Sequence, residues 1–286
     1  MNCESHIEIA ENIYAKNHIR ELIMKGVKLS VVVITLNEEK NIMRCLDSAR
    51  FADEIILVDS GSNDNTCSIA KEYTDKVIFH KMRGFGEQKQ FAVEQATGDW
   101  ILSLDADEWV SMELQDSLSS LLTGSDTPYD GYMIYRRNIY LGRPIRYCGW
   151  YRPILRLFRR GRGCFNNKLV HEEINVIGKT GLLKGDLMHE PYKDIFHHLE
   201  KMKQYASLDA REILGRGRKV YGWQAPIHLL LRPMWKLVEK YLLQQGFREG
   251  IHGLILSCMA AIGVFLIYVF SWQLQKEALH PEKEAL

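Results

Sequence analysis

The sequence lacks an excess of charge of one sign: 37 Lys and Arg residues face 36 Asp and Glu residues, a formal net charge of +1. A balanced chain has no general attraction for polyanions, so we expect no nucleic-acid partner. The sequence also lacks paired cysteines, since its six cysteines are scattered and none stands in a Cys-x-x-Cys motif. This spacing argues against a zinc ribbon or a disulfide framework and is typical of a reducing cytosol.

The amino terminus lacks an uncharged apolar segment. Charged residues recur throughout residues 1–28, so no cleaved signal peptide is expected, and residues 4–25 have the spacing of an amphipathic helix. No repeat of solenoid length is present. The 286 residues are 46% hydrophobic and 26% charged, which predicts a folded α/β domain with an extension.

Apolar runs of strand length alternate with helical stretches in the first part of the chain. Residues 29–34 are apolar without alternation, which is typical of a strand buried on both faces. The repeated order of strand and helix predicts a Rossmann-like α/β fold, with a mostly parallel sheet flanked by crossover helices. Strands are expected at 29–34, 54–58, 76–79 and 100–104, and helices at 41–49, 66–73 and 86–96.

The pattern changes from about residue 130. Strands of a mixed sheet are expected at 132–137 and 155–158, and the chain reads as helical from Tyr192 onward. We therefore divide the chain into an amino-terminal helical appendage, a central α/β domain with two halves, and a helical carboxy-terminal region. Their expected bounds are 1–27, 28–191 (halves 28–110 and 111–191) and 192–286.

Polar clusters follow three of the expected strands. They are Thr35–Glu39, Asp59–Ser62 and Asp105–Glu108. Ligands of open α/β sheets bind outside the carboxyl ends of the strands, where these clusters would meet. A helix cap explains one such cluster, but three acidic clusters at one edge repel each other unless a cation or a ligand offsets them.

The third cluster contains two carboxylates, Asp105 and Asp107, separated by one residue directly after a buried strand. Mg²⁺ and Mn²⁺ prefer oxygen ligands and take one or two carboxylates together with substrate phosphates. A metal held there would neutralise a departing diphosphate. An isolated Asp-x-Asp is often a solvated loop, but its place after the fourth strand favours a metal site.

Four segments together resemble glycosyltransferase family 2, whose members have the GT-A fold. They are Ser-Val-Val-Val-Ile-Thr-Leu-Asn-Glu (30–38), Val-Asp-Ser-Gly-Ser (58–62), Gly-Glu-Gln-Lys (86–89) and Asp-Trp-Ile-Leu-Ser-Leu-Asp-Ala-Asp-Glu (99–108). The resemblance continues through 156–159 and 170–172. It is greatest to the branch that contains the lipopolysaccharide core β-1,4-glucosyltransferases.

The resemblance implies a role for each matching residue. Thr35, Asn37 and Glu38 would line a nucleotide pocket, and Asp59 and Gly61 would hold the uracil end of a UDP-sugar. Lys89 would lie near the sugar nucleotide, Asp105 at the ribose and the metal, and Asp107 would bind Mg²⁺ or Mn²⁺ directly. The sequence departs from the commoner family pattern at Asn63 and Asn65, and both residues suit a turn.

An inverting transfer needs a base that deprotonates the acceptor hydroxyl. Glu172 matches the family's Val-His-Glu position and is the expected catalytic residue. Alternation along a strand would point Glu172 and Glu173 to opposite faces, so one of them would serve. The alternative is that both are surface carboxylates. Because position 175 is Asn, no His-Glu-x-x-His zinc site is present.

Three further residues are candidates for the site. Arg156 and Arg159 belong to an Arg-rich stretch whose guanidinium groups suit phosphates, either of the substrates or of lipid headgroups. His189 would complete the metal site, although a structural histidine is the plainer reading.

Residues 253–272 carry no charge, and about 20 apolar residues suffice to span a bilayer. Three interpretations stay open: a spanning helix, a helix in the membrane plane, and a buried helix of the protein or its dimer. Arg232, Trp235, Lys236 and Lys240 form a basic amphipathic stretch upstream that suits anionic headgroups. The carboxy-terminal extension is therefore expected to associate with a membrane.

The resemblance implies an inverting, metal-dependent enzyme that moves one hexose, glucose from UDP-glucose, to a lipid-linked saccharide such as the lipopolysaccharide inner core. The Gln-x-x-Arg-Trp motif of processive synthases is absent, which favours a single transfer. It would work at the cytoplasmic face of the inner membrane, either peripherally or anchored by its carboxy terminus. Alternatives are a polyprenyl-phosphate acceptor and a non-catalytic nucleotide-sugar-binding membrane protein. The sequence leaves a homo-oligomer open.

Overall fold

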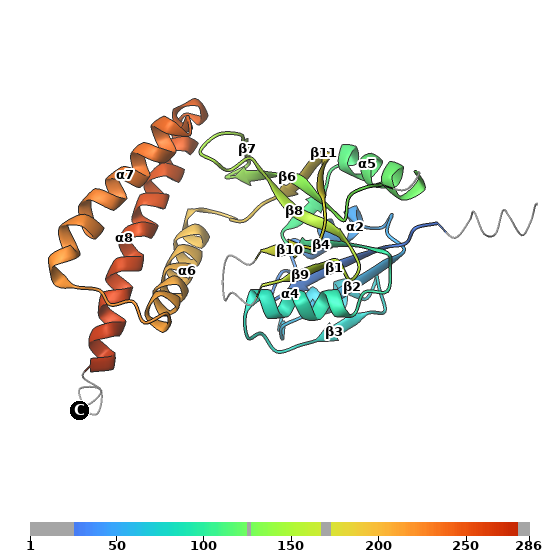
Figure 1. The fold of residues 1–286 in the computed structure, drawn as a ribbon, viewed down its shortest axis with the longest axis horizontal. Helices are drawn as coiled ribbons and strands as arrows, with labels where there is room; N and C mark the ends of the chain where they lie inside the picture. Colours follow the sequence, from blue (N-terminus) through green and yellow to red (C-terminus); the bar gives the residue numbers. More distant parts are fainter. Residues whose placement is uncertain (1–25, 125–126, 167–172, 280–286) are drawn as a thin grey trace, which may run out of the picture.

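The computed structural model describes residues 26–124, 127–166 and 173–279. Figure 1 shows two parts: a sheet with helices packed on its faces, and a group of long helices beside it. The expected helix at 4–25 and the candidate base Glu172 lie outside the described residues.

The first part of the chain builds parallel strands joined by helices. Strands β3, β2, β1 and β4 lie side by side in that order and all run parallel. Apolar, β-branched runs form them, and β1 is buried along its whole length. The strands are β1 (Leu29–Thr35), β2 (Glu54–Asp59), β3 (Val77–Phe79) and β4 (Trp100–Asp105), and the helices are α2 (Ile42–Ser48), α3 (Thr66–Ala70) and α4 (Phe85–Glu94).

The second part of the chain extends this sheet with mixed strands. β8 adds antiparallel to β4, followed by β6, β11 and β5, while β7 pairs with β6. The elements are β5 (Glu108–Val110), α5 (Met112–Thr123), β6 (Gly131–Tyr140), β7 (Arg143–Ile145), β8 (Arg152–Arg159) and β11 (Thr180–His189). A separate two-stranded sheet pairs β9 (Gly163–Phe165) with β10 (Ile174–Val176).

This arrangement confirms the expected α/β GT-A architecture and corrects one detail of it. The large sheet as described has four parallel and four antiparallel pairings, so it is mixed and not mostly parallel. The reason is the connections, because a parallel neighbour needs a long crossover. Helical crossovers join the first four strands, whereas the turn between β6 and β7 reverses the chain within two residues.

The sheet is buried on both faces. Leu29, Val31 and Val33 of β1 pack with α2, α3 and α5 in one core cluster. Val32 and Ile34 point the other way and pack with α4 and Phe165. Strand alternation over a fully apolar run therefore produces two cores, one on each side of the sheet.

The helical region contains α6 (Ile195–Gly215), α7 (Arg232–Val238) and α8 (Ile251–Leu279). Turns of π-helix extend α7 at both ends, over Ile227–Leu231 and Glu239–Leu243. α7 and α8 form a hairpin whose open end is closed by hydrogen bonds between Val220 and Gln275. At the turn, a side chain on Gly253 would come within 1.9 Å of the Gly246 carbonyl oxygen, so only glycine fits there.

Two contacts attach the helical region to the sheet. Buried Glu249, beside the hairpin turn, accepts hydrogen bonds from the amides of Arg146 and Tyr147 at 2.8 and 2.9 Å. His198 of α6 stacks on Tyr192 with a centroid distance of 3.9 Å and shares a 2.9 Å hydrogen bond with the Tyr140 hydroxyl. The helices therefore hold a fixed position beside the catalytic part.

Candidate active site

Strand register brings the three polar clusters to one edge of the sheet. Thr35 pairs with Asp59 across β1 and β2, and Ile34 pairs with Asp105 across β1 and β4. Because these strands are parallel, their carboxyl ends face the same way and the loops that follow them meet. The expected convergence of the clusters is therefore present in the structure.

The first two loops are held together by their own polar side chains. The Asn37 amide donates to Ser62 Oγ at 2.8 Å, and Asn37 Oδ1 accepts from the amide of Asn63 at 2.9 Å. The Glu38 amide donates to Thr66 Oγ1 at 2.8 Å. Asn37 has a φ of 56°, a left-handed conformation that asparagine tolerates better than most residues. These bonds fix the loops without using the Glu38 carboxylate.

Asp59 organises the loop that follows it. Its Oδ2 accepts from the amides of Gly61 and Ser62 at 2.8 and 2.9 Å, and its Oδ1 accepts from Ser62 Oγ at 2.5 Å. Gly61 has a φ of +106°, which suits glycine. Asp59 is 4% exposed, so the turn holds one buried carboxylate at the carboxyl edge of the sheet. A carboxylate keeps acceptor capacity beyond these three bonds.

Asp105 is held between two cationic side chains. Its Oδ1 lies 2.6 Å from Lys89 Nζ, and its Oδ2 lies 2.7 Å from Arg156 Nη2. Burial by itself would raise the pKa of this carboxyl, but Arg156 and Lys89 hold the pKa well below its usual range. Lys89 and Arg156 are both buried, so the pair of cations fixes Asp105 as an oriented anion.

A second carboxylate, Glu108, shares the same arginine. Glu108 is fully buried, and its Oε1 lies 2.7 Å from Arg156 Nη2 and 3.4 Å from Arg136 Nη1. Its Oε2 accepts the Asp105 amide at 3.0 Å. The network therefore fixes the backbone as well as the side chain of Asp105. Arg156 is predominantly a positioning residue here, not a group that faces solvent.

Asp107 faces different partners. His189 Nε2 lies 3.4 Å from its Oδ1, and Lys201 Nζ of α6 lies 3.6 Å from its Oδ2. Burial raises the pKa of Asp107, but His189 and Lys201 outweigh that and lower it. Burial raises the pKa of Glu38, and the neighbouring Asp107 carboxylate adds to the increase. The second carboxylate of the Asp-x-Asp motif thus has cationic or polar neighbours rather than a tight ion pair.

The orientation of His189 follows from its other neighbour. Asn138 Nδ2 donates to the Trp150 carbonyl oxygen at 2.5 Å, so Asn138 Oδ1 must be the atom 2.5 Å from His189 Nδ1. In the neutral ring Nδ1 therefore carries the hydrogen, and the lone pair of Nε2 faces Asp107. His189 and Asp107 therefore bring a nitrogen atom and a carboxylate oxygen to within 3.4 Å of each other.

Thr35 contributes a buried polar atom. The residue is 5% exposed, and its Oγ1 has no hydrogen-bond partner among the described residues. Buried hydroxyls without a partner are uncommon and destabilising. Thr35 is the last residue of β1 and pairs in register with Asp59 of β2.

One candidate from the sequence, Arg159, lies apart from this group. Arg159 pairs in register with Trp100 at the start of β4, about 17 Å of strand from Asp105. It stacks on the Trp100 ring at 4.8 Å and donates to the Tyr129 carbonyl oxygen. Glu172 lies outside the described residues, and Glu173, which precedes β10, is exposed.

Sequence reasoning missed several residues that the fold brings to the edge. Lys201 and Asn138 stand in segments that matched no motif, and Glu108 and Arg136 were given no role. A buried Glu next to an Asp-x-Asp signals a missing counter-charge, which would have directed attention to arginines on the later strands. Lys201 had no such signal, because the contact depends on how α6 packs.

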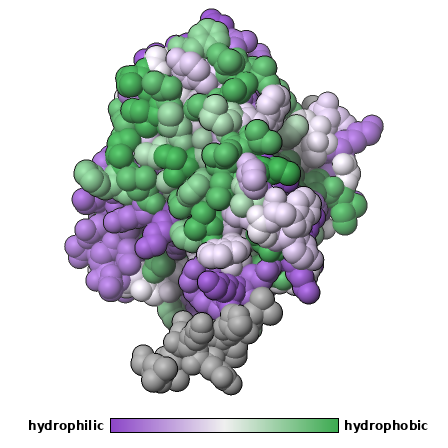
Figure 2. Space-filling model, turned by 90° about the vertical axis from the view of Figure 1, so that its left-hand side faces the viewer, coloured by the Kyte–Doolittle hydropathy of each residue, from purple (hydrophilic) through white to green (hydrophobic). Residues whose placement is uncertain are grey.

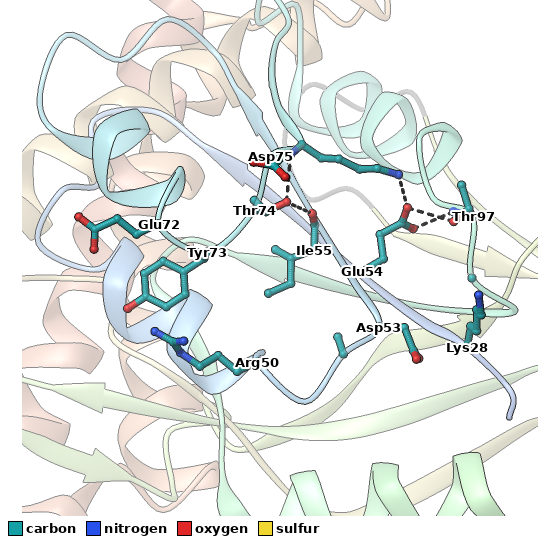
Figure 3. Close-up of a pocket in the computed structure, with 13 residues that line it drawn as sticks. Lys28, Arg50, Asp53, Glu54, Ile55, Glu72, Tyr73, Thr74, Asp75 and Thr97 are labelled. Carbon is teal, nitrogen blue, oxygen red and sulfur yellow. Dashed lines mark hydrogen bonds and ion pairs between the residues drawn. The ribbon is translucent and has the colours of Figure 1, made fainter. Parts of the chain in front are cut away.

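A hollow of about 860 Å³ lies at the opposite edge of the sheet, at the amino ends of β1, β2 and β4. Figure 3 shows Glu54 facing Thr97 there, and the Thr97 amide donates to Glu54 at 2.9 Å. Burial would raise the pKa of Glu54, but Lys76, Ser30 and Thr97 lower it to about 2. The charge of Glu54 is therefore satisfied by its neighbours within the protein.

The profile of Glycosyl transferase family 2 matches residues 30–171. The lipopolysaccharide core biosynthesis glycosyltransferase LpsC of Rhizobium meliloti (strain 1021) is 31% identical over 250 residues, covering 83% of this chain and 89% of LpsC. An uncharacterized glycosyltransferase of Rickettsia typhi is 28% identical over 253 residues, covering 84% of this chain and 85% of that protein. The protein is a glycosyltransferase. It belongs to glycosyl transferase family 2.

Solved structures of similar shape include the mannosyltransferase PcManGT of Pyrobaculum calidifontis in complex with GDP-Man and Mn²⁺. It is 16% identical with a TM-score of 0.49, covering 87% of this chain and 88% of that chain. S. aureus TarS 1–349 in complex with UDP is 17% identical with a TM-score of 0.45, covering 88% and 92%. Likenesses of this size say nothing about what this chain binds.

Proposed function

We propose that the protein is an inverting, metal-dependent glycosyltransferase that moves a single glucose from UDP-glucose to a lipid-linked saccharide, such as the lipopolysaccharide inner core. Membership of family 2 and the name of its relative LpsC support the reaction and the acceptor class. The enzyme would work at the cytoplasmic face of the inner membrane.

The observation that carries this proposal is the oriented pair of carboxylates, Asp105 and Asp107, at the edge where β1 and β4 end. Asp105 is fixed by Lys89 and Arg156, so it can accept hydrogen bonds from a ribose without moving. Asp59 would accept the N–H of uracil, and the unpaired hydroxyl of Thr35 beside it would gain a partner. These groups suit a nucleoside diphosphate.

The same edge suits Mg²⁺ or Mn²⁺. The described residues contain no group of three or more His, Cys, Asp or Glu side chains that would hold a metal by themselves. Asp107 and His189 instead form a pair, and hard divalent cations in such sites take their other ligands from phosphates and water. When bound, the metal would neutralise the charge that develops on the departing diphosphate. Asp105 is already balanced by two cations, so we assign direct binding to Asp107 and His189.

The chain's own residues would complete the transfer. Glu172 would accept the proton of the acceptor hydroxyl as that oxygen bonds to the anomeric carbon and the bond to the diphosphate breaks. The ends of the segment that carries it support this role. The Asn166 amide donates to the Glu173 carbonyl oxygen at 3.1 Å, and the Glu173 amide donates to Asn166 Oδ1 at 3.3 Å. Lys89 Nζ lies 5.8 Å from the centroid of the Phe165 ring, so the described residues that precede position 167 lie close to Lys89.

A donor screen tests the proposal. We expect UDP and UDP-glucose, but not GDP-mannose, to raise the unfolding temperature in the presence of Mn²⁺, because binding to the folded state stabilises it. Asp59→Asn should remove most of that shift. Stabilisation by no nucleotide would contradict the proposal and favour a protein without catalysis.

A second assay separates the acceptor classes. Transfer to a lipid-linked saccharide supports the proposal, whereas transfer to a polyprenyl phosphate alone would support the rival acceptor.

A further inference from the structure

One side of α8 carries large exposed apolar residues. At 100° per residue, these positions fall within an arc of about 80°. They are Ile251, Leu254, Ile262, Phe265 and Trp272. The buried residues Leu256, Ser257 and Met259 lie on the other side of the helix. α8 is thus packed on one side and bare on the other, and 22% of its most apolar 18 residues are buried.

The segment that pairs with α8 carries a second exposed stripe. Its large apolar residues recur at i, i+3, i+4, i+7 and i+8, the spacing of one helix face. They are Ile227, Leu230, Leu231, Met234 and Trp235. Leu231 is 64% exposed and Trp235 is 60% exposed, although large apolar side chains such as these are usually buried. In water such a stripe is normally covered.

Both stripes belong to the hairpin of α7 and α8, which Figure 1 shows beside the sheet. Figure 2 looks at the side of the hairpin that faces away from the sheet, and apolar residues gather there in one broad area. We call the two sets of exposed residues named above the apolar hairpin face. Trp223, 73% exposed, lies where the chain enters the hairpin. Exposed tryptophan at the border of an apolar area is typical of proteins at membrane interfaces.

Exposed cations lie at both ends of this face. Arg218, Lys219 and Lys276 are exposed near its open end, together with Glu277. Arg146 and Arg248 are exposed near the turn of the hairpin. Arg232 is exposed within the segment that carries the second stripe. Basic residues around an apolar helix face bind anionic headgroups while the apolar side chains enter the acyl boundary.

We propose that the apolar hairpin face docks side-on to a bilayer that contains anionic lipid, with α7 and α8 lying in the plane of the membrane. The proposal goes beyond the transfer reaction, because it names the surface that meets the membrane and its orientation. It also decides among the three interpretations of residues 253–272. The described helix Ile251–Ala278 is long and apolar enough to span, so length does not exclude a spanning orientation.

The packing of α6 argues against spanning. Met202 of α6 lies 3.8 Å from the position of a side chain on Gly263, in the middle of α8. The other side of α6 exposes Glu200, Lys203 and Arg211. If α8 crossed the bilayer, these charges would lie alongside it in the hydrocarbon, where each is costly. In the side-on orientation α6 stays in water above α8.

The contacts of the hairpin turn point the same way. Glu249 at the turn is buried against Arg146 and Tyr147, which belong to the catalytic part. A spanning hairpin would need one end far from the domain that contains β7. Here the hairpin contacts the catalytic part at its turn and contacts α6 near its middle. The hairpin is therefore held along its side.

Vesicle binding tests the face. We expect the full chain to co-sediment with phosphatidylcholine vesicles containing 30% phosphatidylglycerol, and less with phosphatidylcholine alone. Leu231→Glu combined with Phe265→Glu should lower binding at least about tenfold, because two charges would enter the acyl boundary. The control is Met112→Glu with Ile177→Glu, which charges two apolar residues of the catalytic part that are more exposed than Leu231 and Phe265. Unfolding temperatures check that each variant is folded.

Sided labelling tests the orientation. In a background without the native cysteines, Gln245→Cys and Gln273→Cys place one thiol at each end of the hairpin, and both positions are exposed. An impermeant maleimide added outside the vesicles should label both. Labelling of only one would overturn the side-on orientation in favour of a spanning helix.

Other results would overturn the docking itself. Equal vesicle binding by the Leu231 and Phe265 double variant and by its control would do so. A stable dimer in solution that the double variant converts to monomer, with no vesicle binding, would assign the face to a second copy of the chain. None of these measurements uses sugar transfer, so a failure here is distinct from a failure of the proposed reaction.

Discussion

The carboxyl edge of the sheet and the apolar hairpin face differ in opposite ways from an ordinary protein. At the sheet edge, charges that normally lie in water are buried: Asp105, Glu108 and Arg156 touch one another with little exposure. At the hairpin, apolar side chains that normally lie inside are exposed. We propose a different partner for each region: a charged, oxygen-rich ligand for the sheet edge and lipid for the hairpin. Residues whose burial or exposure is unusual for their type therefore indicate functional regions better than composition alone.

The largest effect should come from Asp107. Asp107→Asn removes the charge between His189 and Lys201, and should lower transfer by about 10³–10⁴-fold if several kcal/mol of charge stabilisation come from the metal. Metal-dependent donor hydrolysis and Mn²⁺ titration measure the loss. Asp116→Asn on α5 serves as a control. Full activity of the wild-type protein in EDTA would contradict a metal at this edge.

The next effect concerns the base. Glu172→Gln keeps the shape of the side chain and should lower transfer by about 10²–10⁴-fold while donor binding is retained. Glu173→Gln is the matched control and should be mild, because Glu173 is exposed and its backbone amide, which donates to Asn166 Oδ1, is unchanged by the substitution. A dead Glu173 variant with an active Glu172 variant would exchange the two roles. Activity of both would place the base elsewhere.

A smaller effect concerns the dependence of stability on pH through His198 of α6. Burial and then His197 lower the pKa of His198 to about 4, below the ordinary 6.5. The unfolded chain therefore binds the proton first, and stability should fall by roughly 3 kcal/mol as pH drops from 6.5 to 4. Tyr140 and Tyr192 face the same ring. His198→Gln should flatten this part of the stability curve in urea unfolding, and an unchanged curve would contradict it.

The smallest effect concerns Lys201. Its ammonium lies 3.6 Å from Asp107 and would compete with the proposed metal for the same charge. Lys201→Met should tighten binding of Mn²⁺ alone by about fivefold, an energy of about 1 kcal/mol, as expected for an ion pair near water. Lys203→Met, exposed on the same helix, is the control. Weaker Mn²⁺ binding by the Lys201 variant would show that the lysine does not oppose the metal.

The sequence predicted the parallel part of the fold well. The strands at 29–34 and 100–104 were each expected within one residue of their observed bounds, because a fully apolar run bounded by polar loops leaves little choice. The later strands were harder: β11 is only partly buried, contains Gly185 with a φ of +86° and has no clear alternation. Its place between β6 and β5 depends on long-range pairing that local pattern does not encode.

The site could be predicted as far as its motifs reached. Asp59 and Asp105 are the last residues of their strands and Asp107 follows Asp105 by two residues, so their meeting followed from the topology. The partners that orient them did not follow, since Arg156 and His189 come from strands added in the second half of the chain. Arg156 was expected to bind phosphate, and the structure instead surrounds it with Asp105 and Glu108. An arginine-rich stretch does not reveal which of its members points inward.

Lys201 and Met202 are neighbours in the chain, yet one touches Asp107 and the other lies beside Gly263 of α8. With a bilayer against α7 and α8, a single turn of α6 would then set the height of the active site above the lipid. Packed helix axes lie about 8–10 Å apart, and that spacing does not stretch. The distance from the membrane surface to the active site would then be fixed. An acceptor hydroxyl would react only if its saccharide chain is long enough to reach that distance. Chain length of the acceptor, as much as the chemistry of its last sugar, would then decide which molecules are glycosylated.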